Sequence, residues 1–123
     1  MRIRHRLIGE KPRWIGISEL ILKNNYKKYA EIGVYDGQNI INLKKIIPGL
    51  EAYLIDPYKI TKKMKGSLYK QDNMNKTLAQ YKIKVHKALQ HYDDIKYLYI
   101  TSLKAASKFK DDFFDIVFID ADH

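Results

Sequence analysis

The sequence predicts an α/β fold in which a parallel sheet is covered by helices on both faces. Short apolar segments alternate with longer segments whose apolar residues recur every three or four positions, and Gly, Pro and Asp residues separate them. The short segments are apolar on both faces, as expected of strands buried within a parallel sheet. Ligands bind such sheets beyond the carboxyl ends of the strands, so the residues that follow each strand are the candidates for function.

The first half of the chain alternates helix and strand. In order, we expect a helix over residues 17–29 with Ser18 as its N-cap, a strand over residues 29–34, a helix over residues 37–47 and a strand over residues 52–55. Pro48 and Gly49 end the second helix, and Asp56 and Pro57 end the second strand.

The second half continues the alternation after a polar segment. In order, we expect a lysine-rich loop over residues 58–71, a helix over residues 72–92, a strand over residues 97–100, a short helix over residues 103–109 and a strand over residues 113–119. The long helix is predicted from Leu78, Tyr81, Val85 and Ala88, which follow one another at intervals of three or four residues.

Composition sets limits on the class of protein. At 123 residues with 46% hydrophobic residues, the chain can form one core, and its lack of cysteine excludes disulfides and thiolate chemistry. We divide it into a basic N-terminal segment with a helix (residues 1–28) and an α/β domain (residues 29–123). No apolar run approaches the roughly 20 residues that span a bilayer, so we expect no membrane partner and a cytoplasmic location.

The net charge of +9 is concentrated in two regions. Residues 59–87 carry nine lysines and one aspartate, and residues 1–13 carry five cations and one anion. The lysine-rich region leaves open an alternative function, nucleic-acid binding, with Tyr58, Tyr69 and Tyr81 as stacking groups.

Glycines bracket the turn after the first strand, within Glu31-Ile32-Gly33-Val34-Tyr35-Asp36-Gly37. Glycine permits unusual backbone angles and a close approach of a ligand to the chain. A dinucleotide fingerprint would need a third glycine, which this turn lacks, so a nicotinamide-dependent oxidoreductase is disfavoured. Asp56 closes the next strand, where an acid can accept hydrogen bonds from ribose hydroxyls.

The turn resembles the Glu/Asp-x-Gly-x-x-x-Gly turn of the class I S-adenosylmethionine-dependent methyltransferases. The resemblance implies a Rossmann-like sheet with strand order 3-2-1-4 and S-adenosylmethionine as cofactor. It also implies that Glu31, Gly33 and Gly37 hold the cofactor, that Asp56 binds its ribose and that Ser102 lies near its adenine.

The last six residues, Phe118-Ile119-Asp120-Ala121-Asp122-His123, form a second motif. They are similar to the end of the fourth strand in small-molecule O-methyltransferases. That resemblance implies that Asp120 orients the substrate or ligates Mg²⁺ and that His123 serves as general base. It favours transfer of a methyl group to an oxygen of a small molecule. A module related to RNA methyltransferases that uses the lysine-rich residues 59–87 remains the alternative.

The resembling enzymes have seven strands, whereas this sequence supplies about four. We therefore expect an incomplete, truncated Rossmann-like domain over residues 29–123, with weak or no turnover alone. An unpaired edge of its last strand would favour oligomers.

Overall fold

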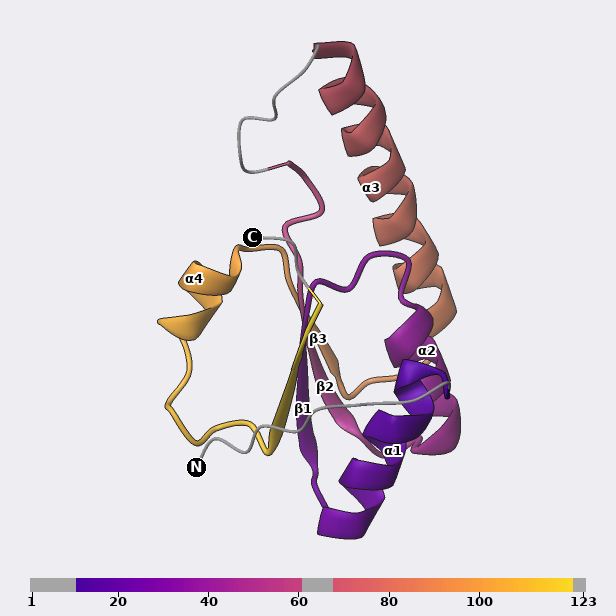
Figure 1. Ribbon diagram of the computed structural model, residues 1–123, viewed down its shortest axis with the longest axis vertical. Coiled ribbons are helices and arrows are strands. Elements are labelled where there is room, and N and C mark those ends of the chain that lie inside the picture. Colours follow the sequence, from indigo (N-terminus) through magenta and orange to yellow (C-terminus); the bar gives the residue numbers. More distant parts are fainter. Residues whose placement is uncertain (1–10, 61–67, 121–123) are drawn as a thin grey trace.

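The computed structural model describes residues 11–60 and 68–120, and a four-stranded parallel sheet forms its centre (Figure 1). The strands are β1 (Lys28–Ile32), β2 (Glu51–Ile55), β3 (Ile95–Leu98) and β4 (Ile116–Ile119). They lie in the order β3-β2-β1-β4, which confirms the predicted order 3-2-1-4 and the Rossmann-like α/β class. Strand β4 is the outermost strand, and the carboxyl ends of β1 and β4 lie side by side, with Ile32 opposite Ile119.

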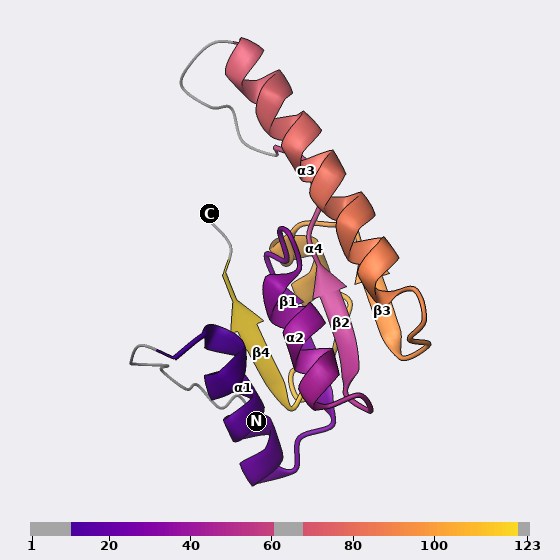
Figure 2. The ribbon, with the colours of Figure 1, turned by 90° about the vertical axis from the view of Figure 1, so that its right-hand side faces the viewer.

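Helices cover both faces of the sheet, as predicted, but unequally. Helices α1 (Arg13–Asn24), α2 (Gln38–Ile46) and α3 (Leu68–Leu89) lie on one face, and the short α4 (Ser102–Ala106) lies on the other (Figure 1). The first turns of α3 project beyond the sheet (Figure 2). The loop predicted over residues 58–71 extends too far toward the C-terminus, because α3 begins at residue 68. Residues 61–67 lie outside the described ranges.

Two apolar cores follow from this layering. The larger lies between the sheet and the three helices and includes Ile17, Ile40, Leu43, Leu54 and Val85. The smaller lies under α4, where Phe109, Phe113 and Phe114 surround Tyr53 with ring centroids 5.1–5.7 Å from its own. The three phenylalanines belong to the connection between α4 and β4, and their rings pack against Tyr53. Strand β4 therefore begins at Ile116 and not at residue 113 as expected.

The predicted start of the first helix was wrong. Helix α1 begins at Arg13 after Pro12, whose fixed backbone angle suits a helix start, and Ser18 lies inside the helix. The Ser18 side chain is buried and its hydroxyl donates a hydrogen bond to the carbonyl oxygen of Ile15 at 2.7 Å. Asn25, in the left-handed conformation, ends the helix earlier than residue 29.

The predicted bounds of β3 and α4 were shifted. Strand β3 spans residues 95–98, not 97–100, and α4 begins at Ser102 and ends at Ala106. Thr101 forms the N-cap of α4, and its hydroxyl oxygen accepts a hydrogen bond from the amide of Lys104.

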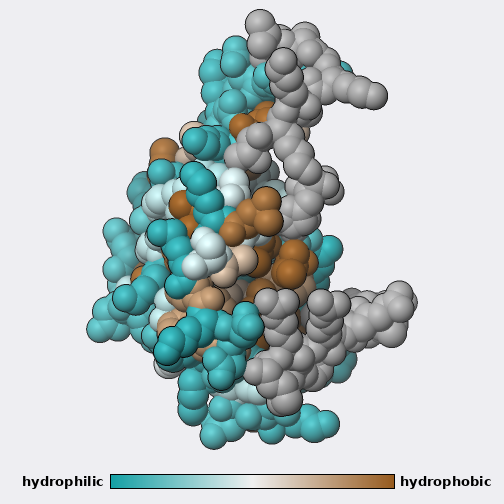
Figure 3. Space-filling model, turned by 90° about the vertical axis from the view of Figure 1, so that its left-hand side faces the viewer, coloured by the Kyte–Doolittle hydropathy of each residue, from teal (hydrophilic) through white to brown (hydrophobic). Residues whose placement is uncertain are grey.

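Part of the sheet on the α4 side carries apolar side chains at its surface (Figure 3). Val117 and Ile119 of β4 pair in register with Ala30 and Ile32, which face the α4 core, yet they are 42% and 60% exposed. The expectation of strands buried on both faces therefore fails at β4. No helix within residues 11–60 and 68–120 is long and apolar enough to cross a membrane.

Candidate functional site

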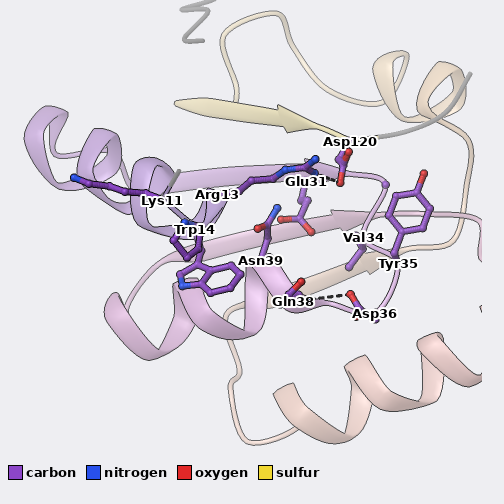
Figure 4. Close-up of a pocket in the computed structure, with 12 residues that line it drawn as sticks. Lys11, Arg13, Trp14, Glu31, Val34, Tyr35, Asp36, Gln38, Asn39 and Asp120 are labelled. Carbon is purple, nitrogen blue, oxygen red and sulfur yellow. Dashed lines mark hydrogen bonds and ion pairs between the residues drawn. The ribbon is translucent and has the colours of Figure 1, made fainter. Parts of the chain in front are cut away.

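A pocket of about 470 Å³ opens at the carboxyl ends of β1 and β4 (Figure 4). This volume lies within the ~300–1,000 Å³ typical of small-molecule sites. Its walls come from the start of α1, the end of β1, the turn before α2 and the end of β4. The lining residues are Lys11, Pro12, Arg13, Trp14, Glu31, Gly33, Val34, Tyr35, Asp36, Gln38, Asn39 and Asp120.

The turn between β1 and α2 has an unusual backbone. Gly33 and Gly37 have φ angles of 84° and 78°, and Tyr35 between them has a φ of 53°. Glycine adopts such angles without steric cost, whereas a tyrosine there carries strain that other contacts must hold. As a result, the backbone amides of Val34 and Tyr35 both point toward the end of β2.

Asp56 and Tyr58 hold this turn from the end of β2. The Asp56 Oδ2 atom accepts hydrogen bonds from the amides of Val34 at 2.9 Å and Tyr35 at 3.1 Å. Its Oδ1 atom accepts one from the amide of Tyr58 at 2.8 Å, and the Tyr58 hydroxyl donates to the carbonyl oxygen of Tyr35 at 3.0 Å. Asp56 is only 7% exposed, so its first role in the fold is to fix the turn.

Glu31 forms the buried acidic floor of the pocket. It is 1% exposed, and the Tyr29 hydroxyl donates a hydrogen bond to its Oε1 atom at 2.5 Å. Burial raises the pKa of the Glu31 carboxyl to about 8, and the nearby charges of Asp120, Asp56 and Asp36 act in the same direction. The Tyr29 hydrogen bond acts the other way but is outweighed. Glu31 is therefore mostly protonated at neutral pH when no cation lies beside it.

Asp120 closes the pocket from β4. Its amide donates to the carbonyl oxygen of Ile32 at 2.8 Å, which places its side chain beside the end of β1. The guanidinium of Arg13 donates from Nη1 to the Asp120 Oδ2 atom at 2.5 Å. This ion pair joins residues that are 107 positions apart in the sequence.

The predicted site residues fall into two groups. Glu31, Gly33 and Asp120 line the pocket together. Gly37 and Asp56 lie behind it, and Ser102 lies at the start of α4, outside the pocket lining. A Cβ atom on Gly37 would lie 2.7 Å from Val85 Cγ2, so this glycine lets α2 approach α3. His123 and Asp122 lie outside the described residues.

The sequence interpretation missed one wall of the pocket, formed by Lys11, Arg13 and Trp14. It treated residues 1–13 only as a basic segment. The usable signal was Pro12 before an amphipathic segment, which marks a helix start and brings its flanking residues to the ligand edge of the sheet.

The described residues do not supply the donor set of a divalent cation. No group of three or more His, Cys, Asp or Glu side chains within residues 11–60 and 68–120 could hold a metal ion. Asp120, the predicted ligand, is engaged by the Arg13 guanidinium. Magnesium sites usually draw on carboxylate and water oxygens, and a bound guanidinium competes for that carboxylate.

Within residues 11–60 and 68–120, the lysine-rich region does not present the predicted stacking groups. Tyr58 is 8% exposed and its hydroxyl is bonded to the turn, and Tyr81 is half-buried against the larger core. The side chain of Tyr69 lies outside the described part of the chain. The nucleic-acid alternative is not favoured by this arrangement.

Comparison with known proteins adds one result. No protein-family model matches the sequence, and no curated protein matches it. Among solved structures, the fold matches the crystal structure titled "putative caffeoyl-CoA O-methyltransferase from Staphylococcus aureus", with a TM-score of 0.62 and 20% sequence identity. The two chains share a fold. The match covers 94% of this chain and 47% of that methyltransferase, so this chain spans about half of its length.

The likeness shows that this chain has the Rossmann-like fold. At 20% identity it shows the fold alone. The pocket lies beyond the carboxyl ends of the neighbouring strands β1 and β4, and ligands bind beyond the carboxyl ends of strands in sheets of this kind.

Proposed function

We propose that this chain binds S-adenosylmethionine and belongs to a methyltransferase that transfers the methyl group to an oxygen of a small molecule. One observation carries the proposal: the Gly33 turn, with its φ of 84°, and the buried Glu31 form adjoining walls of a pocket at the carboxyl edge of the sheet. The fold shared with an O-methyltransferase supports it.

The chemistry of the pocket fits this cofactor. S-adenosylmethionine carries a positive sulfonium, an ammonium group and a carboxylate, and the pocket lining includes the acids Glu31, Asp36 and Asp120 as well as the cations Lys11 and Arg13. A cation beside Glu31 would stabilise its ionised form and lower the raised pKa of that carboxyl. Gly33 has no side chain to keep the ligand from the backbone.

Asp56 retains capacity for the proposed ribose contact. A carboxylate offers about four lone-pair positions, and three backbone amides use three of them. In this proposal one hydroxyl of the ribose donates to Asp56 while the same side chain keeps the turn in place. Ser102 remains the proposed neighbour of the adenine, and Gly37 acts indirectly by setting the position of α2.

The bound cofactor supplies a methyl group on a sulfonium sulfur. That methyl group would pass in line to an acceptor oxygen, and the electron pair of the carbon–sulfur bond would stay on sulfur. The protein's part is to align the acceptor and to exclude water. In the proposal Asp120 orients the acceptor hydroxyl, and His123 takes its proton.

Isothermal titration calorimetry with S-adenosylhomocysteine tests the proposal. We expect saturable binding by wild type and at least about tenfold weaker binding by Glu31→Gln, which cannot ionise beside the ligand's ammonium group. Asp72→Asn, which changes an exposed acid on α3 away from the pocket lining, is the matched control and should bind as wild type. NADH serves as the competing ligand class. Absence of heat with S-adenosylhomocysteine, or equal binding of NADH, would count against the proposal.

A further inference from the structure

The pocket has two walls of opposite charge. The ends of β1 and β4 and the following turn supply Glu31, Asp36 and Asp120. The start of α1 supplies Lys11 and Arg13, and Trp14 adds an aromatic surface between them and the core (Figure 4). The cofactor's sulfonium and ammonium account for the acidic wall, and its single carboxylate can take only one of the two cations. The other cation and the Trp14 ring are left without a partner in the ligand.

Arg13 is held only weakly where it stands. Its pair with Asp120 is short, but the two side chains are 59% and 40% exposed, and such exposed pairs contribute little net free energy. A guanidinium has five N–H donors in a fork that matches a carboxylate in a bidentate manner. A ligand carboxylate that is partly removed from water in the pocket can therefore replace Asp120 as the partner of Arg13.

Lys11 is less suited to this role. Its ammonium donates to the Glu19 Oε1 atom at 3.2 Å, and the two side chains are 71% and 61% exposed. An ammonium also lacks the planar fork that favours a carboxylate over a neutral amide of the same shape. Arg13 is therefore the residue expected to discriminate.

We propose that Arg13 binds the carboxylate of the methyl acceptor, which is a small aromatic carboxylic acid whose ring lies against Trp14. The proposal deepens the proposed function by naming the class of acceptor. It rests on the proposed function only in identifying the bound acid as the methyl acceptor. When Arg13 moves to the ligand, Asp120 loses its partner and its carboxylate becomes free to accept a hydrogen bond from an acceptor hydroxyl. Binding of the correct acid thus exposes the group that orients the oxygen to be methylated.

Trp14 provides a direct readout because it is the single tryptophan of the chain. Benzoate, the simplest aromatic carboxylate, is titrated against the whole chain while Trp14 fluorescence is recorded. Benzamide has the same shape without the charge and serves as the neutral probe. Arg13→Gln removes the proposed partner, and Lys23→Gln removes a cation from the last turn of the same helix.

We expect a saturable change with benzoate in wild type and in Lys23→Gln, at least about tenfold weaker binding in Arg13→Gln, and weak binding of benzamide by all three proteins. Equal affinity of wild type for benzoate and benzamide, unchanged benzoate binding by Arg13→Gln, or no saturable signal with either probe overturns the proposal. Arg13 is exposed, so its variant should retain the wild-type unfolding midpoint, which circular dichroism checks.

The same proteins separate this inference from the proposed function. S-adenosylhomocysteine should bind Arg13→Gln as it binds wild type. If wild type binds benzoate through Arg13 but does not bind S-adenosylhomocysteine, the carboxylate site stands and the methyltransferase proposal fails. If S-adenosylhomocysteine binds while benzoate does not, the cofactor proposal stands and the acceptor class is wrong.

Discussion

The carboxylate of Asp56 lies 2.9 Å from the amide nitrogen of Val34, which joins the end of β2 to the turn that follows β1. The contact is buried, and the neighbouring amide of Tyr35 points at the same oxygen. Hydrogen bonds to a charged acceptor are stronger than those between neutral groups, and burial adds to the cost of losing them. The shape of the turn at the pocket therefore depends on a residue of the adjacent strand.

Replacing Asp56 with Asn should loosen the turn. The amide group can present one oxygen but not two, so at least one of the three backbone amides loses its acceptor. We expect the free energy of unfolding to fall by about 2 kcal/mol, measured by urea denaturation. Asp93→Asn, an exposed acid at the opposite edge of the sheet, should have little effect. Equal stabilities of the two variants would contradict the role of Asp56.

Gly37→Ala should destabilise the protein through two separate effects. The φ of 78° is unfavourable for alanine by roughly 1–2 kcal/mol, and the new Cβ would lie 2.7 Å from Val85 Cγ2. We expect a loss of about 3 kcal/mol, whereas Gly49→Ala, with no atom within 4 Å, should be nearly neutral.

A double-mutant cycle separates the two effects. In Gly37→Ala/Val85→Ala the clash is removed and the backbone strain stays, so the two losses should not add, by about 1 kcal/mol or more. Additive losses in chemical denaturation would mean that the contact with Val85 is not what excludes a side chain at position 37.

The sequence predicted the parts of this fold that depend on local patterns. The apolar spacing of Leu78 and Val85 identified a helix, and the glycines and Asp56 marked two strand ends at the ligand edge. What remained hidden depends on contacts over long separations. Arg13 meets Asp120 across 107 positions, and nothing in either neighbourhood records that pair. Likewise, the pattern could identify Gly37 as special but not show that Val85 is the reason.

Lys44 should be a major determinant of stability although it is charged. Its side chain is fully buried, and its ammonium donates to the carbonyl oxygens of Pro48 at 2.5 Å and Leu50 at 2.8 Å and to Asp94 Oδ1 at 2.7 Å. Lys44→Met fills similar space but leaves these acceptors without a donor. We expect a loss of about 3 kcal/mol in the free energy of unfolding.

Lys45→Met is the matched control for this change, since Lys45 is the exposed neighbour on the same helix. Its effect should stay within about 0.5 kcal/mol. If Lys44→Met unfolds at the same urea concentration as Lys45→Met, the three hydrogen bonds contribute no net stability.

The raised pKa of Glu31 should make stability depend on pH in a direction opposite to that of most acids. Below about pH 4.5 the carboxyl is protonated in both states and imposes no penalty. Between about 4.5 and 8 the unfolded chain releases this proton while the folded protein keeps it, so the folded state binds more protons and stability falls as pH rises. The slope from this one group is at most about 1.4 kcal/mol per pH unit.

Glu31→Gln keeps an acceptor for the Tyr29 hydroxyl and has no proton to lose, so its stability relative to wild type should rise steadily across this window. Urea denaturation of both proteins at several pH values measures the difference, which cancels the other titrating groups. A constant difference from pH 5 to pH 8 would show that Glu31 ionises in the folded protein as it does in the unfolded chain.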